Sequence, residues 1–266
     1  MRWTISQNGW HRINQLNKPV MNQRIQSSIA FQYRMGRLAV FFVVPLIILA
    51  IRLAGYRIRD LGRVRRQVAE IMREHQGPWL ICPNHLTLVD SFILAYAMFP
   101  LHRYVFQYQL VPWNVPEYMN FSRNIFVAAL CYLLKCVPVK RGGDRADVRL
   151  TLEKCAYILS KKENLMIFPE GTRSRTGRVD TRDFTYNVGR LFAQTPACRV
   201  LCIYMRGEGQ DTYSSLPKFG ETFSMAAVEC RPRTAYKGLR AYREYATQIV
   251  NQLAEMEAAY FASRGK

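Results

Sequence analysis

The longest apolar segment of the chain lies near its start, between Arg37 and Arg52, where 14 residues (LAVFFVVPLIILAI) carry no charge. As a helix this run measures about 21 Å, which is shorter than the ~30 Å apolar core of a bilayer. Pro45 in its middle predicts a kink or a break. Three interpretations stay open: a bent helix that dips into one leaflet, which we favour, a span completed by residues 53–56 with Arg52 snorkelling, or a buried core helix, which the basic flanks disfavour.

Residues 60–75 form an amphipathic pattern, in which Leu61, Val64, Val68 and Ile71 recur at helical spacing between Arg and Glu residues. Together with the preceding run, they predict a helical hairpin that lies on a membrane. Residues 1–34 show no such pattern and predict a weakly structured, basic arm. The apolar run starts late and lacks a small-residue cleavage site, so we expect no secretory signal.

From Gly77 onward, short apolar runs alternate with helical patterns. This alternation predicts an α/β fold with a mixed, largely parallel sheet flanked by helices. We expect strands at 78–82, 103–108, 136–140, 165–168 and 200–205. We expect helices at 89–99, 125–135, 144–160, 188–193 and 236–264. The predicted organisation is a basic N-terminal arm (1–36), a membrane-associating helical hairpin (37–76) and an α/β domain with a long C-terminal helix (77–266).

Charge strengthens the membrane hypothesis. The chain has 38 Lys+Arg and 19 Asp+Glu, a net charge of +19, and the first 75 residues hold about half of this excess beside the apolar run. Such a surplus favours anionic partners such as membrane phospholipids. No helix-turn-helix, zinc or RNP-like pattern is present, so we do not expect nucleic-acid binding. The seven cysteines lack C-x-x-C spacing, which indicates reduced, buried residues and no metal site.

Polar residues follow three of the predicted strands, where ligands bind in open α/β sheets. The first strand leads to Asn84 and His85, and Asp90 follows five residues after His85. A helix that begins near Leu88 would place Asp90 in its first turn, within reach of His85. A histidine oriented by a carboxylate is a general base for a hydroxyl group. Alone, the pattern is weak, because a histidine satisfied by backbone groups at a helix start explains it too.

The other two strand ends are rich in cations. Lys140 and Arg141 precede two glycines and a helix, which fits either a phosphate site or a solvated basic turn. The third end reads Phe168-Pro-Glu-Gly-Thr-Arg-Ser-Arg175. There Gly171 permits a sharp turn, and Arg173 and Arg175 offer forked donors to phosphate. Glu170 either pairs with one of these arginines or holds the loop in place.

Two of these motifs, Asn84-His85-x₄-Asp90 and Phe168–Arg175, occur in the order found in the glycerolipid acyltransferases of the 1-acylglycerol-3-phosphate O-acyltransferase type. The chain resembles this family over about residues 60–205. The resemblance implies that His85 deprotonates the acceptor hydroxyl, that Asp90 orients His85, and that no acyl-enzyme forms. The residues it implies for binding the acceptor phosphate are Arg141, Glu170, Gly171, Thr172 and Arg173, with Asn84, Lys140 and Arg175 as further candidates.

The same resemblance implies partners and a location. The donor would be acyl-CoA or acyl carrier protein, without a cofactor or a metal. The acceptor would be a lysophospholipid. The enzyme would lie at the cytoplasmic face of a membrane, monotopic or single-span, through the N-terminal apolar segment.

The chain also departs from the family pattern. Lys135 and Pro138 stand where the family often has glycine and an aromatic residue, residues 200–205 contain no proline, and a Phe-Lys-x-Gly element becomes residues 184–189. Because these elements line the acceptor side, 1-acylglycerol-3-phosphate is the favoured acceptor, and another lysolipid (a lyso-aminolipid or other lysophospholipid) is the alternative. A non-enzymatic basic membrane-binding protein is the alternative from a different class.

Overall fold

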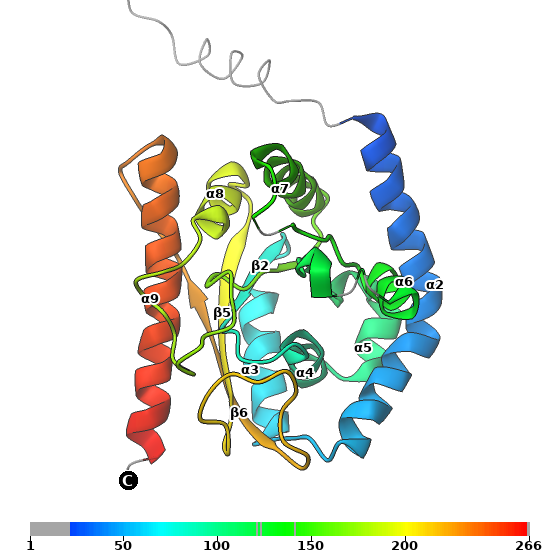
Figure 1. Cartoon of the computed structure of the whole chain (residues 1–266), viewed down its shortest axis with the longest axis vertical. Helices are drawn as coiled ribbons and strands as arrows, with labels where there is room; N and C mark the ends of the chain where they lie inside the picture. The colour runs from blue at the N-terminus through cyan, green and yellow to red at the C-terminus, as the bar shows by residue number, and fades with distance from the viewer. Residues whose placement is uncertain (1–21, 121, 123, 141, 265–266) are drawn as a thin grey trace, which may run out of the picture.

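The computed structural model describes residues 22–120, 122, 124–140 and 142–264, and its centre is one six-stranded sheet (Figure 1). The strand order is β1-β6-β5-β2-β4-β3, and every neighbouring pair is parallel except β5 and β6, which are antiparallel. The strands are β1 (Arg57–Ile58), β2 (Trp79–Pro83), β3 (Trp113–Asn114), β4 (Leu165–Met166), β5 (Arg199–Gly207) and β6 (Thr222–Cys230). The predicted α/β fold with a mixed, largely parallel sheet is confirmed.

Helices cover both faces of this sheet. On one face lie α7 (Arg145–Ser160), α8 (Asn187–Gln194) and α9 (Gly238–Arg264), and on the other lie α3 (Leu61–Arg73), α4 (Asp90–Met98) and α5 (Leu101–Phe106). Residues of β2 alternate between the two layers: Leu80 and Cys82 pack with the first group, and Trp79 and Ile81 with the second. A strand buried on both faces explains why its sequence is a continuous apolar run.

The helix α2 (Gln23–Leu53) runs along one margin of the molecule and bends along its length (Figure 1). It packs against α4, α5 and α6 (Ile125–Leu133). Asn22 caps its first turn by accepting a hydrogen bond from the Arg24 backbone N–H at 2.9 Å. The prediction of an unstructured arm was therefore wrong for residues 23–34, because Ile25, Ile29 and Tyr33 gain a core to pack on. The rest of the arm, residues 1–21, lies outside the described residues.

Pro45 does not break α2, which continues through it. Within the described residues, α2 is the one helix long and apolar enough to cross a membrane by length and composition, and only 22% of its most apolar window is buried. The helix therefore fits the predicted membrane-associating segment. By contrast, α3 turns its apolar residues Val64 and Val68 into the core against α4 and β6, so the outward apolar face belongs to α2.

Two other expectations about secondary structure need correction, and the strands β1, β3 and β6 were not expected. Residues 103–108 were expected to form a strand, but Leu101–Phe106 form α5, which begins directly after Pro100. The expected strand at 136–140 is reduced to two isolated bridges, Asn114 with Cys136 and Glu117 with Val139. The strand β6 (TFSMAAVEC) was not predicted, because alanine and glutamate are uncommon in strands and weaken its pattern. In the structure, most of its buried residues alternate with more exposed ones. Two short 3₁₀ turns, Tyr108–Leu110 and Tyr118–Asn120, complete the described elements.

Candidate active site

The carboxyl ends of the parallel strands β2, β4 and β5 meet at one edge of the sheet and bring together loops that are far apart in sequence. The His85 carbonyl accepts a hydrogen bond from the Ser174 N–H at 3.0 Å, and the Leu86 carbonyl accepts one from the Ser214 N–H at 3.1 Å. The first and third predicted motifs are therefore neighbours.

His85 and Asp90 form the predicted pair. The distance from His85 Nδ1 to Asp90 Oδ2 is 3.0 Å, and the two side chains are 13% and 3% exposed. Asp90 is the first residue of α4, where the helix dipole favours a negative charge. Its carboxylate also accepts hydrogen bonds from the Leu86 and Thr87 N–H groups at 2.7 and 2.8 Å and from the Thr87 hydroxyl at 2.5 Å. These donors fix the carboxylate in place as a hydrogen-bond acceptor for the imidazole.

The second ring nitrogen of His85 remains available. In the described part of the chain no group hydrogen-bonds Nε2, and the ring stacks on Phe168 with centroids 4.0 Å apart and an interplanar angle of 25°. When Nδ1–H is donated to Asp90, Nε2 carries the lone pair that can accept a proton. This arrangement is compatible with the predicted role of His85 as a general base.

Asn84 anchors the end of β2 to β5. Its side-chain amide donates to the Met205 carbonyl at 3.0 Å, and its side-chain oxygen accepts from the Met205 N–H at 2.8 Å. Both polar atoms of this buried side chain are thus used within the protein. Asn84 positions the residue that follows it, His85.

Glu170 links the third motif to the base. It is buried, and its Oε1 accepts a hydrogen bond from the His85 N–H at 3.0 Å, while Oε2 accepts one from the Asp180 N–H at 3.4 Å. Burial raises the pKa of the Glu170 carboxyl group to about 8, although the two backbone hydrogen bonds oppose this shift. No arginine among the described residues forms an ion pair with Glu170, so of its two predicted roles the structure shows the second, holding the loop.

Gly171 makes the turn that follows Glu170. Its φ is +70°, and a Cβ at this position would lie 2.4 Å from Thr185 Cγ2, so a side chain is excluded both by the backbone and by the neighbour. Beyond this turn the half-buried Arg173 donates from Nη1 to the Ser214 carbonyl at 3.2 Å and lies over the Tyr213 ring. Thr172 and Arg175 are exposed. Arg173 is therefore held beside the loop that contacts Leu86.

The second predicted motif is only partly described. Lys140 is exposed and pairs with Asp147 at 3.4 Å, and Asp144 caps α7 as expected. Arg141 lies outside the described residues. A phosphate site at this strand end stays a prediction.

A family model described as Acyltransferase matches residues 58–206, more than half of the chain. The matched range contains His85, Asp90 and the whole third motif. The chain belongs to the acyltransferase family. The predicted resemblance to glycerolipid acyltransferases is confirmed at this level. No curated protein sequence matches this acyltransferase closely enough to count as a relative.

The acyltransferase holds its third motif in place with a buried network that the sequence analysis missed. Arg206, at the end of β5, donates to the carbonyls of Gly177 and of Asp211, the latter at 3.1 Å. Glu257 on α9 accepts hydrogen bonds from the Tyr204 hydroxyl at 3.2 Å and from the Val179 N–H at 3.1 Å. One signal was present: Glu257 follows Leu253 by four residues on the apolar face of the C-terminal helix.

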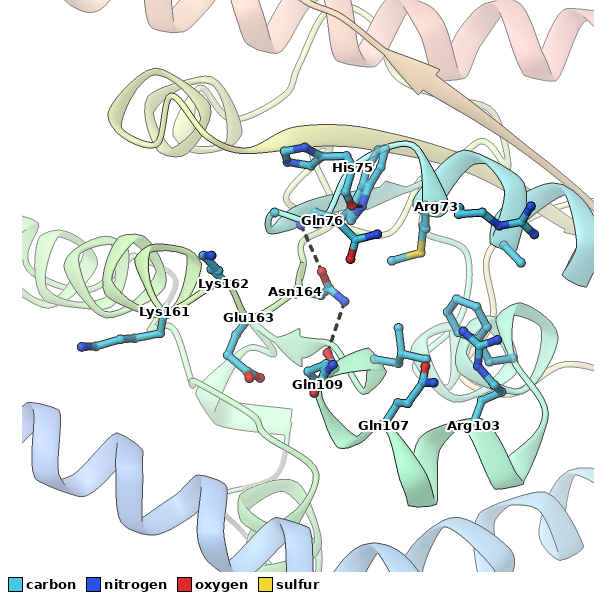
Figure 2. Close-up of a pocket in the computed structure, with 16 residues that line it drawn as sticks. Arg73, His75, Gln76, Arg103, Gln107, Gln109, Lys161, Lys162, Glu163 and Asn164 are labelled. Atoms are coloured by element: carbon cyan, nitrogen blue, oxygen red, sulfur yellow. Dashed lines mark hydrogen bonds between the residues drawn. The ribbon is translucent and has the colours of Figure 1, made fainter.

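The acyltransferase also has a hollow of about 420 Å³ at the opposite edge of the sheet, where β2 and β4 begin. Figure 2 shows Arg73 and Arg103 on one side of it, Lys161 and Lys162 on the other, and Asn164 between them, hydrogen-bonded to the Gln109 carbonyl and the Trp79 N–H. We call this cavity the basic hollow. The His85–Asp90 pair lies beyond the other end of β2, so the basic hollow is not the site of the predicted chemistry.

Proposed function

We propose that this acyltransferase moves a fatty acyl group from acyl-CoA or acyl carrier protein to the free hydroxyl of a lysophospholipid. The favoured acceptor is 1-acylglycerol-3-phosphate, which gives phosphatidic acid. The observation that carries the proposal is the His85–Asp90 pair. His85 Nδ1 is hydrogen-bonded to the Asp90 carboxylate, and His85 Nε2 has no partner among the described residues.

The geometry supports direct transfer. The acceptor hydroxyl gives its proton to His85 Nε2 while its oxygen attacks the thioester carbonyl carbon, and Asp90 stabilises the imidazolium that forms. The tetrahedral intermediate then collapses, the carbon–sulfur bond breaks, and the thiol leaves with the proton from His85. No residue of the protein has to carry the acyl group.

Recognition of the acceptor phosphate is assigned to the third motif. Arg173 has guanidinium N–H groups beyond the one that binds Ser214, and a guanidinium donates to phosphate in a forked geometry. Thr172, Arg175, Lys140 and Arg141 are proposed to add donors around it, and Gly171 supplies the turn that exposes them. Glu170 is proposed to act indirectly, because its carboxyl group accepts a hydrogen bond from the His85 N–H and so holds the His85 backbone in place. A lysolipid with a different headgroup remains the alternative acceptor.

The membrane is the proposed source of the acceptor, and α2 is the proposed anchor at its cytoplasmic face. Buried residues occur on α2 from Ile29 to Ile51, so the helix lies against the domain over most of its length. If α2 crossed the bilayer, the domain packed along it would have to enter the apolar core as well. The packing therefore favours monotopic insertion into one leaflet. A small apolar cleft of about 50 Å³ between α2 and α4 includes Ser91 and Phe92 in its wall, next to Asp90.

The general-base proposal is tested with His85→Ala in purified enzyme, using labelled acyl-CoA and acyl carrier protein with 1-acylglycerol-3-phosphate. We expect the rate of product formation, read by mass spectrometry, to fall at least about a thousandfold, while vesicle binding is unchanged. The control is Arg103→Ala in the basic hollow, which should retain wild-type activity. Retained transfer by His85→Ala would refute the mechanism, and absence of transfer by the wild type would favour the non-enzymatic membrane-binding alternative.

The acceptor is tested with Arg173→Ala on a panel of lysolipids with and without a terminal phosphate. Loss of a charged donor to phosphate should raise KM for the phosphate-bearing acceptor by about tenfold or more and leave KM for the acyl donor unchanged. Equal effects on donor and acceptor, or equal effects on acceptors with and without the phosphate, would contradict phosphate binding at Arg173.

A further inference from the structure

The helix α6 (Ile125–Leu133, IFVAALCYL) has no charged residue, and none of its nine residues is buried. Ile125 and Phe126 are 79% and 82% exposed. The Asn124 side chain caps the helix by accepting hydrogen bonds from the Phe126 and Val127 N–H groups at 2.9 and 3.2 Å, so its start is defined. A helix this short is marginal in water by itself. Its outward apolar side chains therefore need an apolar environment that the described protein does not supply.

The position of α6 is fixed by α2. The Gln32 side chain donates hydrogen bonds to the carbonyls of Tyr132 and Cys136, both at 3.0 Å. A Cβ on Gly36 would lie 2.6 Å from the Leu133 carbonyl oxygen, so this glycine allows the close approach of the two helices. Figure 1 shows α6 beside α2 at the same margin of the molecule.

The exposed side of α2 is a continuous apolar stripe. Its large exposed residues recur three or four positions apart, which is one face of a helix. They are Phe31, Met35, Leu38, Phe42, Leu46, Leu49 and Leu53, and Phe41 beside Phe42 is exposed as well. The opposite face carries the buried residues Ile29, Gly36, Val40 and Ile51. Phe106, at the end of α5, is also 83% exposed, and α5 packs on α2.

Charge identifies an anionic lipid leaflet as the occupant of this surface. The helix α2 carries Arg24, Arg34, Arg37 and Arg52 and no acidic residue, and the sequence from Tyr118 to Gly143 has no acidic residue either. Basic residues beside exposed apolar side chains are attracted to anionic headgroups. Two such faces would repel each other in a dimer of a chain with a net charge of +19.

We propose that α6 is a second membrane-inserting element, whose Ile125 and Phe126 enter the same anionic leaflet that receives the α2 stripe. The protein then docks through two helices fixed to each other, and not through the N-terminal helix alone. The docking does not depend on acyl transfer, so the catalytically disabled His85→Ala protein should dock equally well.

The test measures binding of the full chain to sucrose-loaded vesicles that contain phosphatidylcholine and phosphatidylglycerol. Because burial of one phenylalanine contributes strongly to insertion, Phe126→Gln should lower the partition coefficient about tenfold. The matched control is Leu239→Gln, since Leu239 is 82% exposed and belongs to α9, a helix at the opposite margin of the molecule (Figure 1). This control should bind as the wild type does.

A second measurement does not remove apolar surface. In vesicles with brominated acyl chains, Phe126→Trp should show more fluorescence quenching than Leu239→Trp, with the four native tryptophans common to both proteins. Equal quenching would overturn the proposal. Wild-type partitioning of Phe126→Gln would also overturn it, and a change in its oligomeric state alone would indicate that a second copy of the chain covers α6.

Discussion

The two edges of the sheet carry different kinds of polar group, and only one of them is organised for chemistry. At the carboxyl edge, Asp90 receives hydrogen bonds from three backbone or side-chain donors besides His85, and the imidazole is fixed between the carboxylate and the Phe168 ring. At the amino edge, the basic hollow is a sizeable cavity, but none of Arg73, Arg103 and Lys162 forms an ion pair within the described chain. We therefore place the proposed reaction at the carboxyl edge, on the ground of the connected network around His85 and not of the size of a cavity.

The ordered polar group of the amino edge is a buried ion pair. The Lys135 ammonium donates to Glu163 at 2.7 Å and to the carbonyls of Val111 and Tyr108 at 2.9 and 3.2 Å, and its side chain is fully buried. Burial lowers the pKa of Lys135 to about 8, although the charge of Glu163 opposes this shift. The Lys135 ammonium is saturated by three protein acceptors, whereas His85 Nε2 has no partner among the described residues.

The largest effect that we expect from this difference concerns Asp90→Asn. The amide is neutral, so it cannot stabilise the imidazolium that forms on His85 as the carboxylate does. We expect kcat to fall by about ten-thousandfold, or about 5.5 kcal/mol in activation free energy. Rapid-quench measurement of acyl transfer tests this, with Asp147→Asn on the exposed face of α7 as the control. A decrease in kcat of less than about tenfold would show that Asp90 does not orient the base.

The next effect is on stability and belongs to the amino edge. Lys135→Met leaves the half-buried Glu163 carboxylate without its cation and two carbonyl oxygens without a donor, which should lower the free energy of unfolding by about 3 kcal/mol. The matched control is Lys140→Met, because the pair of Lys140 with Asp147 is exposed and should contribute less than about 0.5 kcal/mol.

Denaturant unfolding in one detergent measures both variants. The folded fraction of Lys135→Met should retain a kcat within about twofold of the wild type, since no hydrogen bond among the described residues joins the partners of Lys135 to the His85 loop. Equal destabilisation by the two lysine substitutions, or a specific loss of kcat in Lys135→Met, would remove the distinction between the edges.

The part of the site that could be predicted from sequence is the part that is local. Asp90 lies five residues after His85, and one turn followed by a helix start is enough to join them. The role of Glu170 depends on contacts with His85 and Asp180, and that of Glu257 on contacts with residues more than 50 positions away. Sequence spacing contains no information about these distant partners, so Glu170 stayed ambiguous and Glu257 was missed.

The same limit applies to the fold. The strand β2 was recognised because burial on both faces makes its sequence uniformly apolar. The run at 103–108 (RYVFQY) is rich in aromatic residues, which favoured a strand, yet most of it lies in α5, because periodicity in so short a segment does not separate strand from helix. The start of α2 was misjudged because polar residues between Gln23 and Arg34 hide three core contacts that exist only after folding.

The smallest expected effect tests the carboxyl edge through pH. Burial raises the pKa of Glu170 to about 8 from an ordinary value of 4.5, so between these values the folded protein holds a proton that the unfolded chain has lost. Stability from this group is complete below about pH 4.5 and is lost as the pH rises through about 8. Relative to Glu170→Gln, which cannot titrate, the wild type should lose about 2 kcal/mol of unfolding free energy between pH 6 and pH 8, because each pH unit contributes at most about 1.4 kcal/mol.

The Glu170→Gln variant keeps a side-chain oxygen that can accept the hydrogen bond from the His85 N–H. The control is Glu153→Gln, which removes a carboxyl group on α7 beside Arg149. Denaturant unfolding at several pH values should give parallel curves for the wild type and Glu153→Gln and a flatter curve for Glu170→Gln. If all three curves are parallel, Glu170 is ionised in the folded protein, and the base is held beside a second negative charge.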